Sequence, residues 1–233
     1  MKHLTPLSVY FAGIEPFQDP AFTEQAMKAA SPERREQANR FRFAKGRARS
    51  LGAELLLRKA LLDNGITERE LKYGYGPEKK PYLINLPEFH FNLSHSGNYV
   101  MLAAADREVG CDIEKIARAN FQIAKRFFAP EEYKRILAAP LEEQNEWFYR
   151  YWTLKESFLK VTGRGLDLPM NEFEIRFSDG YPAVRHALGD CMYALAELRG
   201  VKGYCSAVAA EGETLSAGCE FVDLTEVLRE IGQ

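Results

Sequence analysis

The sequence predicts an α+β protein built from two halves. Segments with the apolar spacing of helices are followed by apolar or alternating segments of strand length, and this order occurs twice along the 233 residues. The second series begins near Asp106 to Val109. We therefore expect one half over residues 1–106 and a second over residues 107–233, each an antiparallel sheet packed with helices. A chain of this length can bury a substantial core.

The first half is expected to open with a strand and continue with helices. Leu7 to Ala12 has the composition of a strand, and Ala21 to Ala30 that of a helix. Ser31 followed by Pro32 predicts the start of a second helix, because Ser caps helix N-termini and Pro suits the first turn. Apolar residues at helical spacing predict a long third helix from Gly46 to Leu62.

A loop and two strands are expected to complete the first half, and a further strand to begin the second. Tyr73 to Lys80 contains Gly and Pro and reads as a loop. The strands expected next are Phe89 to Ser94, Tyr99 to Ala105 and Val109 to Ile113.

The second half is expected to repeat the order of helices and strands. Helices are predicted to begin at Phe121 and Pro130, and a long one from Glu142 to Val161 is predicted to end at Gly163. The strands expected after it are Phe173 to Phe177, Tyr193 to Leu198, Tyr204 to Ala209 and Cys219 to Val222.

Composition indicates a soluble, reduced protein. Hydrophobic residues make up 46% of the chain and charged residues 27%, and the apolar runs are far too short to cross a bilayer. The N-terminus has no small-residue cleavage site, so we expect no signal peptide and no membrane partner. The four cysteines lack Cys-x-x-Cys spacing, so we expect reduced thiols and a cytoplasmic location.

Positive charge is concentrated in one segment. Between Arg34 and Lys59 there are nine basic residues and two acidic ones, although the whole chain carries a net charge of −2. This asymmetry indicates a polyanionic partner, which can be a phosphorylated ligand, an acidic protein or nucleic acid. A solvated helix face is an equally good explanation of the charge run alone.

Two groups of charged residues have the period of the element that carries them. Asp112 and Glu114 lie two residues apart in an expected strand, so both side chains project from one face. Glu156 and Lys160 lie four residues apart in an expected helix, with Lys155 beside them. Carboxylates without a His or Cys partner favour a hard cation such as Mg²⁺, and lysines suit phosphate.

Simpler explanations exist for each group. Asp112 and Glu114 can face solvent on a sheet, although their apolar neighbours and their mutual repulsion argue against this. Glu156 and Lys160 can be an ordinary helix-surface ion pair, worth about 0.3–0.5 kcal/mol. Bulky apolar residues cover most of that helix, so charges confined to a narrow strip favour a cleft.

Three motifs together resemble a known family. Ser94 and His95 at the end of an expected strand are a weak signal alone, and no Gly-x-Ser-x-Gly supports a serine hydrolase. In combination, the segments resemble the signature motifs of 4′-phosphopantetheinyl transferases of the large, surfactin-synthetase-activating type. The three motifs are Phe91-Asn92-Leu93-Ser94-His95-Ser96, Val109-Gly110-Cys111-Asp112-Ile113-Glu114 and Trp152-Thr153-Leu154-Lys155-Glu156-Ser157-Phe158-Leu159-Lys160. Further counterparts are Ser31 to Glu36, Lys80-Pro81, Ile123 to Phe128 and Gly163 to Leu166.

The resemblance implies two similar halves related by a pseudo-twofold axis, with coenzyme A in the cleft between them. It implies that Mg²⁺ on the coenzyme pyrophosphate is held by Asp112, Glu114 and Glu156. The residues implied to contact the 3′-phosphate and adenosine portion are Arg34, Ser50, Lys80, Ser94 and His95. Lys155 and Lys160 are implied on the pyrophosphate side. Family members often have a second basic residue near Gln37, and Arg40 or Arg49 can compensate for this neutral residue.

The implied activity is transfer of 4′-phosphopantetheine from coenzyme A to a serine of an apo acyl or peptidyl carrier protein. Glu156 is expected to take the serine proton, directly or through water, and Lys160 to balance the charge of departing 3′,5′-ADP, with Asp112 supporting catalysis through the metal. Carrier proteins are acidic near that serine, so the basic segment and Ala119 to Leu137 are candidate docking surfaces. We expect a monomer, because one chain supplies both halves.

Three alternatives remain open from the residues alone. A non-catalytic module that binds coenzyme A or a carrier protein would have the same fold but would not transfer phosphopantetheine. A Mg²⁺-dependent phosphohydrolase would release phosphate without any carrier. Nucleic-acid binding through the basic segment predicts steep salt dependence, and we expect no such partner if the resemblance holds.

Overall fold

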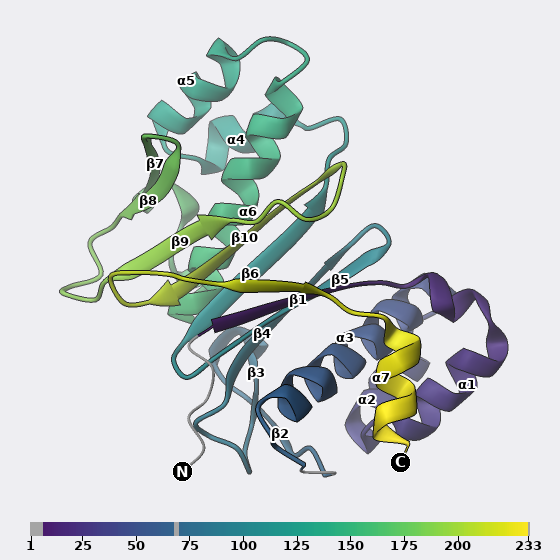
Figure 1. Cartoon of the computed structure of the whole chain (residues 1–233). Helices are drawn as coiled ribbons and strands as arrows, with labels where there is room; N and C mark the ends of the chain where they lie inside the picture. The colour runs from purple at the N-terminus through teal and green to yellow at the C-terminus, as the bar shows by residue number, and fades with distance from the viewer. Residues whose placement is uncertain (1–6, 68–69, 233) are drawn as a thin grey trace. The chain divides into compact units, whose positions relative to one another are not determined.

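The structure is a computed structural model that describes residues 7–67 and 70–232. Contacts divide the chain into two compact units (Figure 1). Unit 1 comprises Met1–Tyr75, Pro81–Asp106 and Ala217–Gln233, and unit 2 comprises Gly76–Lys80 and Arg107–Ser216. The division expected at residues 106 and 107 differs from this in two segments, because the C-terminal segment packs in unit 1 and Gly76–Lys80 packs in unit 2.

Unit 1 contains a four-stranded sheet with the order β11-β1-β5-β4. The strands are β1 (Leu7–Gly13), β4 (His90–Ser96), β5 (Tyr99–Ala105) and β11 (Gly218–Phe221). β5 pairs antiparallel with both β1 and β4, as expected, but β11 runs parallel to β1. No short turn joins β11 to β1, so no local connection imposes the antiparallel direction on this pair.

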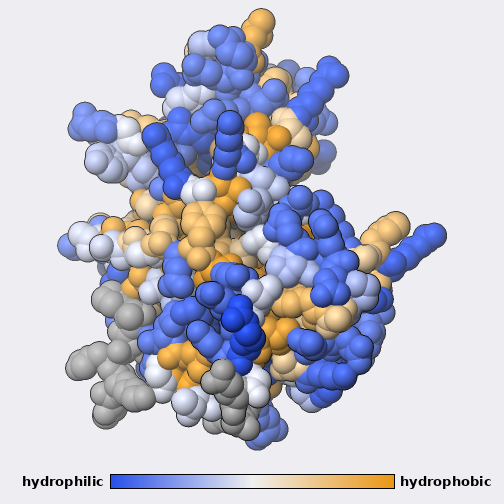
Figure 2. Space-filling view, turned by 45° about the vertical axis from the view of Figure 1, so that its right-hand side comes forward, coloured by the Kyte–Doolittle hydropathy of each residue, from blue (hydrophilic) through white to orange (hydrophobic). Residues whose placement is uncertain are grey.

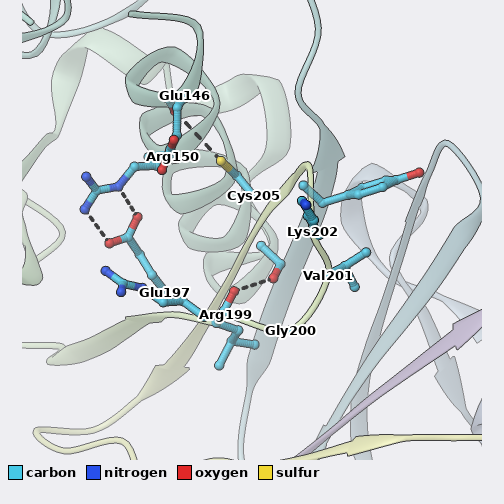
Figure 3. A pocket seen from close by; sticks show the side chains of 11 residues that line it. Glu146, Arg150, Glu197, Arg199, Gly200, Val201, Lys202 and Cys205 are labelled. Atoms are coloured by element: carbon cyan, nitrogen blue, oxygen red, sulfur yellow. Dashed lines mark hydrogen bonds and ion pairs between the residues drawn. The ribbon is translucent and has the colours of Figure 1, made fainter. Parts of the chain in front are cut away.

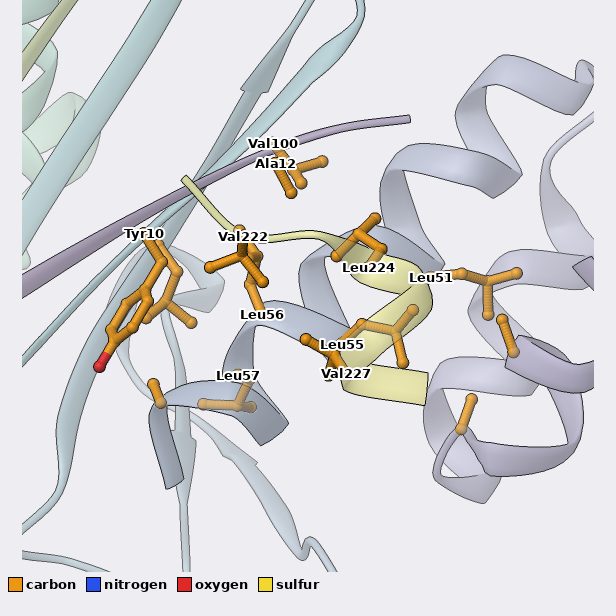
Figure 4. Packing of buried hydrophobic residues seen from close by; sticks show 14 of the residues in the cluster. Tyr10, Ala12, Leu51, Leu55, Leu56, Leu57, Val100, Val222, Leu224 and Val227 are labelled. Carbon is orange, nitrogen blue, oxygen red and sulfur yellow. The ribbon is translucent and has the colours of Figure 1, made fainter. Parts of the chain in front are cut away.

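Four helices accompany this sheet: α1 (Pro20–Ala29), α2 (Pro32–Arg40), α3 (Ala44–Asp63) and α7 (Leu224–Ile231). The Ser31 hydroxyl accepts a hydrogen bond from the Arg34 backbone N–H at 3.2 Å, which confirms the predicted start of α2. Figure 4 shows Leu51, Leu55 and Leu56 of α3 beside Val222 and Leu224 in the unit 1 core. The sequence prediction missed α7, whose apolar stripe is short.

A short hairpin also belongs mostly to unit 1. Its strands are β2 (Tyr73–Tyr75) and β3 (Pro81–Leu83), which pair antiparallel. We expected a loop over Tyr73 to Lys80, but its first three residues, Tyr73–Tyr75, form strand β2. Glu78 and Lys79 between the strands have positive φ values of 53° and 60°.

Unit 2 contains a three-stranded antiparallel sheet with the order β6-β10-β9. The strands are β6 (Val109–Lys115), β9 (Tyr193–Glu197) and β10 (Tyr204–Glu211), and a hairpin of β7 (Glu174–Ser178) and β8 (Tyr181–Arg185) lies outside the sheet. The helices are α4 (Phe121–Phe127), α5 (Pro130–Ala138) and α6 (Gln144–Thr162). Helix α6 ends at Gly163, whose φ of 64° is accessible because glycine has no side chain.

The two units repeat one arrangement, which confirms the predicted α+β class with two similar halves. In each, a first strand leads through helices to a pair of strands, and the second strand of that pair lies between the other two: β5 lies between β1 and β4, and β10 lies between β6 and β9. One long helix accompanies each sheet, α3 with 20 residues and α6 with 19.

The surface is mainly hydrophilic on the face that Figure 2 shows, with hydrophobic groups exposed between the hydrophilic ones. Among the most exposed large hydrophobic side chains are Phe43, which is 72% exposed, and Leu141, which is 81% exposed. Across residues 7–67 and 70–232, no helix has both the length and the apolar character that crossing a bilayer requires. None of the four cysteines, all of which lie among the described residues, forms a disulfide bond.

Candidate active site

The site in unit 2 depends on a close approach between strand β6 and helix α6. A Cβ atom added to Gly110 would lie 2.2 Å from the Ser157 carbonyl oxygen and 2.5 Å from the Val161 nitrogen. The two backbones are therefore in direct contact at Gly110, which only glycine permits. Residues two and four positions further along β6 share the face of Gly110, so Asp112 and Glu114 lie along α6.

Lys160 joins the helix to the strand within this contact. Its ammonium group donates hydrogen bonds to Asp112 Oδ1 at 2.7 Å and to the Cys111 carbonyl oxygen at 3.0 Å. Asp112 is 4% exposed, so its carboxylate has largely lost water and is held by the lysine instead. The structure thus brings two of the predicted catalytic residues into contact.

The third predicted catalytic residue, Glu156, lies on α6 one turn before Lys160. Burial raises the pKa of the Glu156 carboxyl, and the charges of Asp112 and Glu114 raise it further, whereas Lys160 acts in the opposite direction. The carboxylates of Asp112 and Glu114 are therefore close enough to Glu156 to act on its charge. Burial lowers the pKa of Lys160, but Asp112 and the other nearby groups outweigh it, and the pKa is raised.

These carboxylates fit a magnesium ion in their chemistry. They supply only hard oxygen donors, and the repulsion that raises the pKa of Glu156 is the kind that a bound cation relieves. Within the described ranges, however, no three His, Cys, Asp or Glu side chains already form a metal-binding group. Lys160 holds one oxygen of Asp112. The assignment of Asp112, Glu114 and Glu156 as Mg²⁺ ligands therefore stays a prediction.

The predicted contact of Lys155 with pyrophosphate would require its side chain to leave a buried site. The Lys155 side chain is 0% exposed and its Nζ lies 2.9 Å from Glu132 Oε1. It also donates to the carbonyl oxygens of Met170 and Phe173. Consecutive helix residues point about 100° apart, so Lys155 faces the core when Glu156 and Lys160 face β6. Sequence reasoning missed Glu132, although Pro130 to Glu132 carries the signal of a helix start.

Arg34 occupies a buried polar network in unit 1. Its Nε donates to Glu54 Oε2 at 3.2 Å, its Nη1 donates to Gln37 at 2.9 Å, and its guanidinium lies over the Tyr73 ring. The side chain is only 10% exposed. The predicted contact with a 3′-phosphate would require Arg34 to leave these partners. Gln37, at the position where a basic residue was sought, is instead a partner of Arg34.

The remaining unit 1 residues lie on α3 and β4. Arg49 donates to the Gly97 carbonyl oxygen from Nη2 at 2.6 Å and from Nε at 3.1 Å, which links α3 to the turn after β4. Ser50 is 5% exposed, and its hydroxyl has no hydrogen-bond partner among the described residues. Ser94 and His95 lie near the end of β4, with His95 exposed.

Lys80 belongs to unit 2. Its ammonium donates to Glu108 Oε2 at 2.6 Å and to the Val109 carbonyl oxygen at 3.0 Å, beside the start of β6. It therefore lies near the strand that carries Asp112, and its predicted contact with coenzyme A stays a prediction.

Much of the basic segment is neutralised by carboxylates inside unit 1. Glu54 pairs with Arg34 and Arg58, and Lys59 pairs with Asp63 at 2.5 Å. Arg40 pairs with Glu36. The positive charge that the sequence concentrates here is thus partly an internal feature of helices α2 and α3, which weakens the argument for a nucleic-acid partner.

A cavity of about 460 Å³ lies at one end of the unit 2 sheet (Figure 3). Arg150 and Glu197 form a bidentate ion pair in its wall, with N–O distances of 2.6 and 2.7 Å. Cys205, also in the wall, is the cross-strand partner of Glu114. None of the predicted site residues lines this cavity, and sequence reasoning did not single it out.

Comparisons with known proteins give the family. The model of the 4′-phosphopantetheinyl transferase superfamily matches residues 108–209, and that of the N-terminal region of 4′-phosphopantetheinyl transferases matches residues 18–107. A 4′-phosphopantetheinyl transferase from Bacillus subtilis is 38% identical over 67% of this chain and 70% of its own length. The chain belongs to the 4′-phosphopantetheinyl transferase family.

One further relative and one solved structure are similar to this chain. The 4′-phosphopantetheinyl transferase Sfp from Bacillus subtilis (strain 168) is 37% identical over 69% of this chain and 73% of its own length. A holo-(acyl-carrier-protein) synthase from Bacillus anthracis, solved in complex with CoA (3′,5′-ADP), has a TM-score of 0.40 and 19% identity, and the match covers 46% of this chain and 96% of that chain.

Proposed function

We propose that this protein transfers 4′-phosphopantetheine from coenzyme A to a serine hydroxyl of an apo acyl or peptidyl carrier protein. The observation that carries the proposal is the Lys160–Asp112 contact with Glu156 beside it, in a chain that belongs to the 4′-phosphopantetheinyl transferase family. We place the reaction in the cytoplasm, where cysteines that form no disulfide, as in this chain, stay reduced.

The residues of unit 2 would perform the chemistry as follows. Asp112, Glu114 and Glu156 would hold Mg²⁺, which when bound supplies positive charge to the coenzyme pyrophosphate. Glu156 accepts the proton of the carrier serine, directly or through water. The serine oxygen then bonds to the β-phosphorus, and the bond to the bridging oxygen breaks. Lys160 offsets the negative charge of the departing 3′,5′-ADP.

The coenzyme would be recognised by polar residues from α3, β4 and the segment before β3. Ser50 supports this proposal, because a buried hydroxyl with no partner among the described residues is available to a ligand. Arg49, His95 and Lys80 supply the cationic groups that a 3′-phosphate requires. Arg34 would act indirectly, as part of the Glu54 network that holds α2 against α3.

An exposed apolar and basic group supports an acidic carrier as the partner. Phe127 is 43% exposed, and the Arg126 guanidinium lies 5.1 Å from its ring centroid. Phe128 is instead 3% exposed and belongs to the unit 2 core. Only part of the Ala119 to Leu137 segment can therefore contact a carrier.

The experiment is to incubate the protein with Mg²⁺, coenzyme A and an apo carrier, and to measure the mass of the carrier. We expect an increase equal to one phosphopantetheine on the carrier serine, and none in the presence of a chelator. Glu156→Gln should abolish this increase but leave coenzyme binding largely intact. Glu24→Gln, an exposed residue of α1 outside every predicted site and docking segment, is the matched control and should transfer normally.

The assay also separates the alternatives. Coenzyme binding without any mass increase would indicate a binding module, and phosphate release without a carrier would indicate a phosphohydrolase. Near-normal transfer by Glu156→Gln would remove Glu156 from the chemical step.

A further inference from the structure

A buried ion pair lies directly beside the proposed active site. Lys155 on α6 and Glu132 on α5 are separated by 2.9 Å, and their side chains are 0% and 1% exposed. Burial lowers the pKa of the Lys155 ammonium and raises that of the Glu132 carboxyl, so burial opposes both charges. Replacing such a pair with apolar groups often leaves stability unchanged or improves it. Stability alone therefore does not account for this pair.

The pair is the centre of a fully connected network. Lys155 Nζ also donates to the Met170 carbonyl oxygen at 2.7 Å and the Phe173 carbonyl oxygen at 2.9 Å. Glu132 accepts from the backbone N–H groups of Ala129 at 2.8 Å and Ile175 at 2.6 Å. The network thus ties one residue of α6 to the start of α5 and to the chain leading into β7.

This attachment fixes the rotation of α6 about its own axis. Lys155 directly precedes Glu156 in α6. Any rotation of α6 about its axis that moved Lys155 away from its three acceptors would therefore turn Glu156 relative to β6 by the same angle. On the other side, the contact at Gly110 brings the α6 backbone against β6. Helix α6 is thus held from both sides, and Glu156 lies between the two points of attachment.

We propose that Glu132 and Lys155 are positioning residues that orient Glu156 and Lys160 for phosphopantetheine transfer. This inference rests on the proposed function. Neither residue is expected to touch coenzyme A or the carrier, since both are buried. Their effect should therefore appear in the rate of the chemical step more than in substrate binding.

The test uses the double variant Glu132→Gln/Lys155→Met, which removes both buried charges together and avoids leaving either one unpaired. We expect a folded protein, by circular dichroism and a cooperative thermal transition, whose kcat is lower by about tenfold to 100-fold. Its KM for coenzyme A should stay within about twofold of wild type, because the coenzyme contacts are unchanged. A kcat within twofold of wild type in the folded variant would overturn the inference.

The matched control is a second ion pair that involves α6, between Arg150 of α6 and Glu197 of β9. Arg150 and Glu197 form a bidentate pair but lie in the cavity wall, away from Glu156. Arg150→Met/Glu197→Gln should keep the wild-type kcat. An equal loss in this control would show that any disturbance of α6 lowers the rate, and would also overturn the inference.

Transfer by the wild-type protein tests the proposed function separately. Should the wild type fail to modify a carrier, the inference is judged by Mn²⁺ binding in isothermal titration calorimetry. The double variant should then bind Mn²⁺ about tenfold more weakly than wild type, because misplaced carboxylates bind a metal less well. The inference would be overturned if the double variant and the wild type bound Mn²⁺ with equal affinity, or if neither bound it.

Discussion

Gly110→Ala should disrupt the active site although alanine is the smallest possible change. The added Cβ would lie 2.2 Å from the Ser157 carbonyl oxygen and 3.0 Å from the Lys160 carbonyl carbon, and both are backbone atoms that cannot rotate away. Restoring a separation of about 3.0 Å requires α6 and β6 to part by about 0.8 Å. The same movement would lengthen the 2.7 Å contact between Lys160 and Asp112 to about 3.5 Å, the limit of a hydrogen bond.

The expected free energy of unfolding falls by about 1–3 kcal/mol, as for other overpacked sites. Turnover should fall by about tenfold to 100-fold, because the reacting groups are displaced by nearly 1 Å. Urea denaturation followed by tryptophan fluorescence measures the first quantity, and carrier mass shift with time measures the second.

Gly52→Ala is the matched control. This glycine lies within helix α3, and the nearest atom to its added Cβ would be 3.4 Å away. Alanine should therefore leave turnover unchanged and stabilise the protein by about 0.5–1 kcal/mol, since helical glycine is unfavourable. The reasoning is wrong if the Gly110→Ala variant has the same urea midpoint of unfolding as the wild type and modifies the carrier at the same rate.

Three further predictions follow from other contacts. Glu54→Gln should lower the free energy of unfolding by about 3–5 kcal/mol in urea denaturation, because buried Arg34 loses its carboxylate partner; a change below 1 kcal/mol contradicts this. Burial, together with nearby carboxylates, raises the pKa of Cys205 to about 12, so at pH 8 its thiol stays protonated. Iodoacetamide should therefore label exposed Cys191 but not Cys205 in peptide mass spectra, and equal labelling would refute the assignment. Lys160→Met should reduce carrier modification at least 100-fold, since the charge on the departing group then lacks its counter-ion; retention of a tenth of the activity would exclude that role.

Local patterns in the sequence predicted the elements of the site well. The strand with Asp112 and Glu114 and the helix with Glu156 both form, and the helix ends at Gly163 as expected. These features depend on periods of two and 3.6 residues and on helix-end signals, all of which act over a few neighbouring residues.

The contacts that the sequence did not predict involve partners that are distant in sequence. Lys155 was assigned to pyrophosphate, but its partner Glu132 lies 23 residues earlier on another helix. Arg34 was assigned to a phosphate, but Glu54 on the next helix holds it. A charged side chain in an amphipathic helix can face a ligand or a buried counter-charge, and helical spacing is the same in both cases.

The sequence by itself determined the α+β class, the repeated order of helices and strands, the family, and the spacing that places Glu156 and Lys160 on one stripe. The tertiary structure alone decided which lysine faces β6 and which is buried, and that the C-terminal segment adds β11 parallel to β1. The physical reason is that periodicity fixes directions only relative to an element's own axis. The rotation of α6 is set by its packing at Gly110 and by the charge of Glu132, which no local pattern contains.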